Sequence, residues 1–135
     1  MLKNYKYAMT GKKEVGPSVS YLANFSEVME KRVAGEEWAL TDLHLLLSQA
    51  ACYLLQLSAN CIMNKPEGWS NLDVWNKRAG IELKRLSVCH SVIYTFNAFK
   101  NAVEEHKVPQ NKAILTQLCQ LFGINSIMSY SSVVT

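Results

Sequence analysis

The sequence predicts an all-α protein, an antiparallel helical bundle of about three main helices. Three observations predict it. Three long stretches carry apolar residues at helical spacing, and glycine and proline are scarce, with 6 and 3 among 135 residues. The chain is also 49% hydrophobic and 19% charged, which supplies enough apolar surface to offset the chain entropy lost on folding. We therefore expect a packed helical unit rather than a disordered chain or a many-turned β fold.

The longest predicted helix covers residues 72–103 and is expected to end near His106-Lys107. Its apolar residues form two adjoining rows: Ile81, Val88, Val92 and Phe99, and Leu86, Cys89, Ile93, Phe96 and Val103. Two adjoining rows make a face too wide for a two-stranded seam, so this helix needs at least two neighbours. Ser70 is the expected N-cap, and Asp73 adds negative charge to the first turn, where the exposed N–H groups favour it.

Two further helices flank this one. The first spans residues 40–63, is apolar on nearly all sides, and is ended by the run Lys65-Pro66-Glu67-Gly68. The last begins at Pro109, with Gly123 as a candidate terminator. Its apolar residues are Ile114, Leu115, Leu118, Cys119, Leu121 and Phe122.

The chain divides into four predicted regions. Residues 1–22 read as the end of a preceding helical domain and its exit segment, 23–39 as a linker, 40–124 as the helical-bundle domain and 125–135 as an atypical C-terminal tail. Within the first region we expect a short helical face formed by Leu2, Tyr5 and Met9. Residues 18–22 are expected to be extended or irregular, and the polar connection 24–37 is expected to hold a short helix.

Composition argues against several classes of protein. The net charge is only +3 and the lysines and arginines are scattered, so we expect no nucleic-acid binding. Residues 43–63 carry no formal charge and could cross a bilayer by length, but six polar side chains interrupt them, and we expect a buried helix instead. The four cysteines form no CxxC pair and are predicted to be reduced, small core hydrophobes. No secretory signal is expected at the N-terminus.

We predict no catalytic and no metal-ligating residue, and the cofactor-binding residues stay unknown. His90 is the strongest candidate for acid–base chemistry, yet its neighbour Cys89 points to another side of the helix, so a hydrogen-bonded core or interface role is favoured. His44 and His106 are interpreted as a helix-start and a helix-end residue. The acidic pairs at residues 36–37 and 104–105 are interpreted as solvated. The tryptophans, Trp38, Trp69 and Trp75, are expected at the core or a domain boundary.

Three ordered stretches resemble the acyl-CoA oxidases. The first is Val74-Trp75-Asn76 with Leu83, Arg85, Ser87, His90 and Phe99, similar to the Trp-Asn helix of that family's C-terminal helical domain. The second, Tyr5 with Gly11-Lys12, Gly16 and Val19 to Leu22, resembles the segment that leaves the family's preceding helical domain. The third, Leu118-Cys119 and Leu121 to Ile124, resembles the family's next helix.

The resemblance implies a larger flavoenzyme of peroxisomal fatty-acid β-oxidation, in which a glutamate takes the C2 proton of an acyl-CoA, FAD takes the hydride, and dioxygen reoxidises the flavin with formation of hydrogen peroxide. The family's catalytic glutamate lies before the point matched by Met1, and Val92 stands where the family often has a second histidine, so no catalytic residue carries over. We expect a fragment or short isoform, inactive alone, with acyl-CoA and FAD as ligands of the intact enzyme. Its expected partner is a second copy or a full-length subunit. The resemblance implies a peroxisomal location although the peroxisomal tripeptide is lacking, and the alternative location is cytoplasmic. The alternative is a non-catalytic helical interaction module, which the wide apolar faces suggest.

Overall fold

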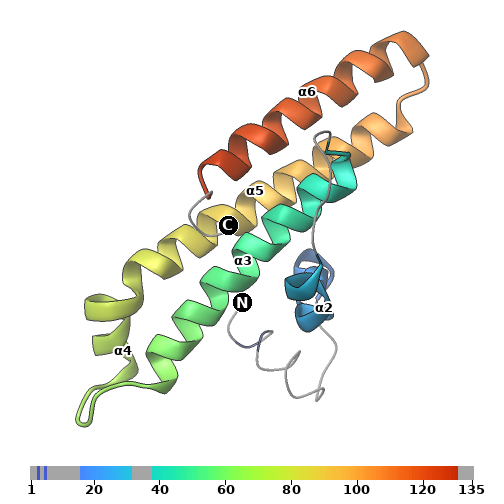
Figure 1. The fold of residues 1–135 in the computed structure, drawn as a ribbon. Helices are drawn as coiled ribbons and strands as arrows, with labels where there is room; N and C mark the ends of the chain where they lie inside the picture. The colour runs from blue at the N-terminus through green and yellow to red at the C-terminus, as the bar shows by residue number, and fades with distance from the viewer. Residues whose placement is uncertain (1–2, 4, 6–15, 32–37, 131–135) are drawn as a thin grey trace.

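The computed structural model describes residues 3, 5, 16–31 and 38–130, and every regular element in these residues is helical. Three long helices form the bundle: α3 (Leu40–Met63), α5 (Gly80–Glu105) and α6 (Pro109–Met128). Helix α5 runs antiparallel to α3, and α6 returns antiparallel to α5 (Figure 1). Each of the three contacts the other two. The predicted all-α antiparallel bundle is confirmed.

Helix α3 has the bounds that the sequence predicts. Asp42 Oδ2 accepts a hydrogen bond of 3.0 Å from the backbone N–H of Ala39, which satisfies a donor at the helix start. The face toward α5 and α6 is closely packed, since Leu43, Leu47 and Leu54 are fully buried. Tyr53 and Leu57 are 39% and 36% exposed and lie at the border of this face. Some apolar side chains of α3 therefore remain exposed on the surface of this chain.

The helix predicted over residues 72–103 consists of three consecutive helical elements. It begins as α4 (Asn71–Val74), widens into the π-helical turn η2 (Trp75–Ala79) and continues as α5. The prediction of a single uniform helix is wrong at η2, where the helix is π rather than α. A Cβ on Gly80 would lie 2.8 Å from the carbonyl oxygen of Trp75, so glycine is what permits this close approach of the backbone to itself. The predicted end is confirmed, because His106 caps α5.

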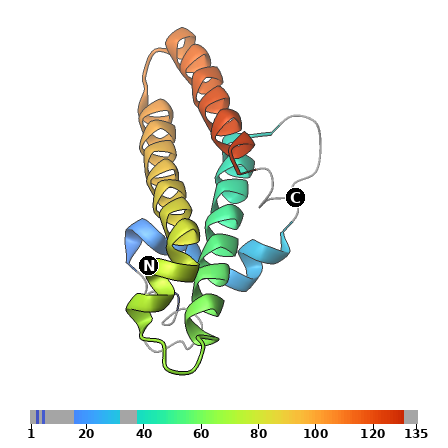
Figure 2. The same ribbon diagram turned by 90° about the vertical axis from the view of Figure 1, so that its left-hand side faces the viewer.

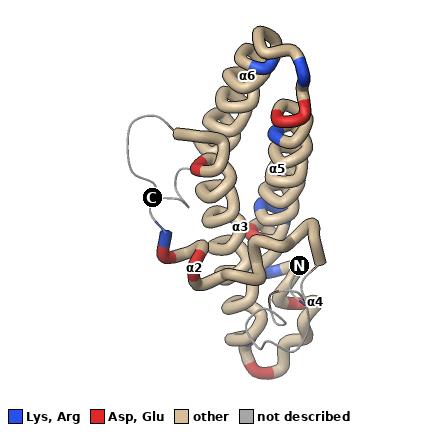
Figure 3. The backbone as a smooth tube through the Cα atoms, turned by 90° about the vertical axis from the view of Figure 1, so that its right-hand side faces the viewer, with Lys and Arg blue, Asp and Glu red and all other residues tan. Residues whose placement is uncertain are grey.

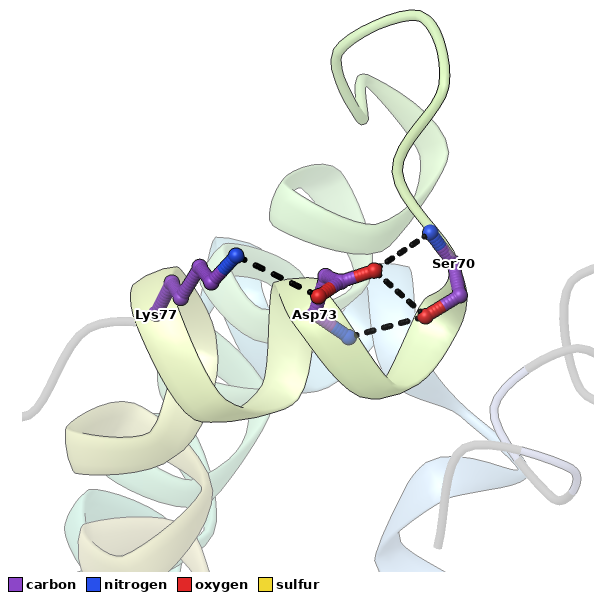
Figure 4. A network of polar contacts seen from close by, with 3 residues as sticks. All are labelled: Ser70, Asp73 and Lys77. Atoms are coloured by element: carbon purple, nitrogen blue, oxygen red, sulfur yellow. Dashed lines mark hydrogen bonds and ion pairs between the residues drawn. The ribbon is translucent and has the colours of Figure 1, made fainter.

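The start of α4 is a reciprocal cap, as Figure 4 shows. Ser70 Oγ accepts a hydrogen bond of 3.1 Å from the backbone N–H of Asp73, and the Asp73 carboxylate accepts from the backbone N–H and the hydroxyl of Ser70 at 2.9 and 2.7 Å. Lys77 Nζ lies 3.3 Å from the same carboxylate. These contacts hold the pKa of Asp73 at about 2, and the hydrogen bonds from Ser70 contribute most. The predicted N-cap is confirmed.

The two apolar rows of α5 have different surroundings. The row of Leu86, Cys89, Ile93, Phe96 and Val103 is buried along its whole length against α3 and α6. The other row divides: Val92 and Phe99 pack against the core, whereas Ile81 and Val88 are 73% and 50% exposed. One row is therefore a bundle seam, and the other reaches the surface at the start of the helix.

Gly123 does not end the last helix, which continues to Met128. A Cβ at Gly123 would lie 2.8 Å from Phe96 Cε2 and 3.0 Å from Leu43 Cδ1. The missing side chain lets α6 approach both neighbouring helices closely, so this glycine serves packing rather than termination. Figure 2 shows the resulting hairpin, in which α6 returns from the α5–α6 turn toward the start of α3.

The N-terminal segment packs on the side of α3 away from α6. Pro17–Leu22 form the short 3-10 helix η1, and Phe25–Glu30 form α2. Of the extended or irregular segment predicted at residues 18–22, the extended form is wrong, because Pro17 opens a tight turn in which Val19 N donates to the Gly16 carbonyl at 3.1 Å; the backbone is irregular at Val19, whose dihedral angles are not helical. The short helix expected in the 24–37 connection is confirmed as α2. The helical face expected from Leu2, Tyr5 and Met9 lies largely outside the described residues.

Helix α3 is long and apolar enough to cross a membrane by length and composition, the one such helix in the part of the chain that the structure describes. In the bundle, 56% of its most apolar window is buried. Burial against α5 and α6 accounts for that composition, as in the central helix of a soluble bundle.

Candidate functional site

A part-buried polar contact joins the N-terminal segment to α5. Tyr21 Oη and His90 Nδ1 share a hydrogen bond of 3.1 Å, although the residues are 69 positions apart. Burial raises the pKa of the Tyr21 hydroxyl and lowers that of His90, so both groups are neutral near pH 7. A neutral, mutually satisfied pair stabilises a fold and lacks the orienting acid of a catalytic histidine. The favoured structural interpretation of His90 is confirmed.

Cys52 and Cys89 line the same part of the core and are inert thiols. Burial raises the pKa of both to about 12, which leaves them protonated and unreactive at neutral pH. Cys89 Sγ donates to the Leu47 carbonyl at 3.7 Å rather than to His90. All four cysteines are free, and Cys52, Cys89 and Cys119 are fully buried as predicted, while Cys61 is half-buried.

The other two histidines lie where the sequence places them. His44, in the second turn of α3, shares a hydrogen bond of 3.2 Å with Asn97 of α5. Burial and nearby Lys100 lower the pKa of His44. His106 caps α5, and its Nε2 is buried without a hydrogen-bond partner among the described residues. Among the residues that the structure describes, no hydrogen bond or ion pair joins either imidazole to a nucleophile or a carboxylate that would make it a general base.

The remaining candidates divide between the surface and the edge of the core. Glu104 and Glu105 are exposed as predicted, whereas the pair at 36–37 lies outside the described residues. Trp38 packs against the core. Trp69 is half-buried beneath Lys77, whose Nζ is 5.0 Å from the ring centroid, and Trp75 is 47% exposed. Trp38 therefore has the expected core position, Trp69 lies at the edge of the core, and Trp75 is outside the core; a domain-boundary position stays a prediction for Trp75.

The described part of the chain contains no cluster of residues that could hold a metal ion. Across residues 16–31 and 38–130 no three His, Cys, Asp or Glu side chains gather closely enough to hold a metal ion. The space between the three helices is filled by side chains such as Phe96, Leu43 and Leu47, which are fully buried.

The most distinctive surface is the outer face of α6, which we define as Ile114, Leu118, Leu121, Ile124 and Met128. These side chains recur at intervals of three and four residues, and their exposed fractions range from 38% for Ile124 to 70% for Met128. The helix carries no charged residue after Lys112, as the tan tube of α6 beyond its first turn shows in Figure 3. An uncharged apolar face of this length is typical of a surface that another polypeptide covers.

The family model for acyl-CoA oxidase matches residues 39–135, well over half of the chain and all three bundle helices. The chain belongs to the acyl-CoA oxidase family. Acyl-CoA oxidases generally use FAD, form oligomers and are typically peroxisomal. No curated protein and no solved structure matches the chain. The family match begins at residue 39, so the resemblance of residues 5–22 to a family segment stays a prediction, as does the division into four regions.

Sequence reasoning missed the contacts that tie distant segments together. The Tyr21–His90 and His44–Asn97 hydrogen bonds join residues 69 and 53 positions apart. Gln49 Nε2 donates to the carbonyls of Val28 and Lys31, at 2.9 and 2.6 Å, and so fixes the end of α2 on α3. A polar residue within an apolar helical stretch was the available signal at His44, Gln49 and His90, but it does not identify the partner.

Proposed function

We propose that this chain is the C-terminal helical portion of a peroxisomal-type acyl-CoA oxidase, and that it acts in fatty-acid β-oxidation as a packing element rather than as a catalyst. The family match over residues 39–135 supports the assignment. The observation that carries the packing role is the pairing of an inert polar interior with an uncharged apolar outer face on α6. In the assembled enzyme the bundle supports residues elsewhere that bind FAD and acyl-CoA.

The chain alone does not oxidise acyl-CoA. Its histidines are engaged in hydrogen bonds or in capping a helix, its buried thiols are protonated, and no described carboxylate is placed in a pocket to take the C2 proton. FAD supplies hydride acceptance when it is bound in an acyl-CoA oxidase. In that enzyme, the residues described here contribute shape and rigidity to one side of the protein that surrounds the flavin.

The outer face of α6 packs against the same bundle of a second oxidase chain. Two observations support this occupant. The face lacks charge, so two copies meet without like-charge repulsion. It also forms a single helical stripe, which can pair with itself across a two-fold axis. The second chain is another short chain or a full-length subunit, because both carry this bundle.

An activity assay tests the proposal that the oxidase requires this bundle but that the bundle does not itself catalyse the reaction. The purified 135-residue chain, supplied with FAD and an acyl-CoA, is expected to form no hydrogen peroxide above a protein-free control. An acyl-CoA oxidase from which the corresponding bundle has been deleted is expected to be inactive as well, and co-expression with this chain is expected to restore peroxide formation. Turnover by the chain alone contradicts the proposal, and so does a deleted oxidase that keeps full activity.

A non-catalytic role in the cell is the second candidate, and the same exposed stripe on α6 favours it. In that case the short chain covers the bundle of a full-length subunit and changes its assembly. Adding the chain to an intact oxidase separates the two candidates. A change in the mass of the oxidase without a change in peroxide formation per active site favours the interaction module, whereas restored activity in the deleted oxidase favours the structural portion.

A further inference from the structure

A second surface feature lies away from the outer face of α6, between the start of α5 and the end of α6. It is a concave pocket of about 410 Å³ lined by Ile81, Lys84, Arg85, Val88, Ser129 and Tyr130. We call it the α5–α6 side pocket. Its volume falls within the usual range of small-molecule sites, roughly 300–1,000 Å³. A whole helix from a partner protein does not fit in that space, whereas a small molecule does.

The pocket concentrates positive charge that nothing in its lining balances. Among the described residues, Lys84 and Arg85 supply both of its charged side chains, and no acidic residue lines it. Neither cation forms a hydrogen bond or an ion pair within the described ranges, in contrast to Lys31, Lys77 and Lys100, each of which pairs with a carboxylate. The end of α6 brings no charge to the pocket, because residues 113–130 contain none. Two cations beside one concavity favour an anion.

The other residues that line the α5–α6 side pocket are two apolar ones, Ile81 and Val88, and two that carry hydroxyl groups, Ser129 and Tyr130. Ile81 and Val88 are one side of α5 and remain 73% and 50% exposed. Tyr130 is buried, and burial raises the pKa of its phenol, which is therefore neutral and able to donate a hydrogen bond at neutral pH. Apolar surface next to unpaired cations fits a ligand that has an alkyl part and an anionic head.

We propose that the α5–α6 side pocket binds a small amphipathic carboxylate, with the carboxylate held by Lys84 and Arg85 and the alkyl chain lying over Ile81 and Val88. The hydroxyls of Ser129 and Tyr130 are the remaining polar groups available to the head group. This site is separate from the interface proposed for α6, and the binding of a carboxylate does not depend on the proposed role in acyl-CoA oxidation.

Sodium decanoate, kept below its micelle concentration, is the probe, and the resonances of the purified full chain in ¹⁵N–¹H NMR spectra are the readout. Residues 81–88 and 129–130 are expected to show saturable shifts. The double variant K84Q/R85Q is expected to bind decanoate at least about tenfold more weakly, because two charge-assisted contacts are lost. The matched control K77Q/K107Q removes the same charge outside the pocket and is expected to stay within about twofold of wild type.

Two further probes test each half of the ligand. Decanol has the same alkyl chain without the charge, and acetate has the charge without the chain; both are expected to bind at least about tenfold more weakly than decanoate. The proposal is overturned if decanoate causes no saturable shifts, if K84Q/R85Q binds it as tightly as wild type, or if decanol or acetate matches it. Circular dichroism shows whether each variant is folded, and all four substituted side chains are exposed or half-buried, so folding is expected to survive.

Discussion

The inner and outer sides of α6 carry similar side chains and meet opposite surroundings. On the inner side, Cys119 and Ile127 are buried, and Gly123 lies against Phe96 and Leu43. On the outer side, Leu121 is 63% exposed. Both sides follow helical spacing, so the spacing alone does not distinguish a surface packed within the chain from one available to another chain. The comparison shows that apolar side chains on α6 that the bundle does not bury are the feature that indicates a functional surface.

Truncation on the two sides gives the largest expected contrast. Phe96→Ala removes a fully buried ring at the meeting point of the three helices and is expected to cost about 3–5 kcal/mol of unfolding free energy. Leu121→Ala on the outer face is expected to change it by less than about 0.5 kcal/mol when unfolding is measured below the concentration at which the chain self-associates. Urea denaturation followed by circular dichroism measures both. If Phe96→Ala fails to fold, Phe96→Leu provides a milder test, and equal effects on the two sides contradict the comparison.

Adding volume on the inner side of α6 is expected to give the next largest change in the unfolding free energy. Gly123→Ala places a methyl group 2.8 Å from the buried Phe96 ring, so the strain is expected to exceed the gain in helix propensity and to destabilise the fold by about 1–2 kcal/mol. Asn125→Ala, at an exposed position of the same helix, is the control and is expected to be neutral or slightly stabilising. A Gly123→Ala variant more stable than wild type would show that α6 does not approach α5 this closely.

The cap of α4 is exposed to solvent, so a change there tests stabilisation at the surface without altering the core. Ser70→Ala removes the acceptor for the Asp73 N–H and is expected to cost about 1 kcal/mol, with faster amide exchange confined to the start of α4. Ser87→Ala serves as the control, because that exposed hydroxyl only donates to the Leu83 carbonyl of its own helix. Faster exchange spread over the whole bundle would mean that the cap and the core are coupled.

Acid is expected to weaken the seam between α3 and α5 by a smaller amount. Burial and then Lys100 lower the pKa of His44 in the fold, so the unfolded chain binds the proton more readily. Stability is therefore full above the unfolded pKa of about 6.5 and declines as the pH falls through that value toward the lower folded pKa. His44→Gln removes this titration and is expected to flatten the decline between pH 7 and 5, measured as the unfolding free energy at each pH. An unchanged slope contradicts it.

The parts of the fold that local chemistry determines were predictable. The bounds of α3, the cap at Ser70 and the start of α6 at Pro109 follow from side chains within a few residues of each terminus. The passage of α6 through Gly123 was not predictable, because it depends on Phe96 and Leu43 from two other helices. The π-helical turn η2 and the short helix η1 were missed for a related reason: Gly80 and Pro17 permit these forms, but packing against the rest of the chain selects them over the α-helix.

The candidate surfaces were less predictable than the fold. The sequence gives Ile114, Leu118 and Leu121 only as apolar residues of the last helix, and the arrangement of α6 on its neighbours shows that they are exposed. The side pocket joins Arg85 to Tyr130 across 45 positions of sequence, which no local pattern indicates. Sites assembled from separate helices become visible only once the helices are placed.

Sedimentation velocity tests most directly whether the outer face of α6 is an interface between oxidase chains. The wild-type chain at micromolar concentration is expected to sediment at twice its 15.2 kDa mass or above, and to join a complex when mixed with a full-length acyl-CoA oxidase. The variant L118Q/L121Q, folded by circular dichroism, is expected to remain a monomer in both experiments. A wild-type chain that stays monomeric, alone and in the mixture, contradicts the account.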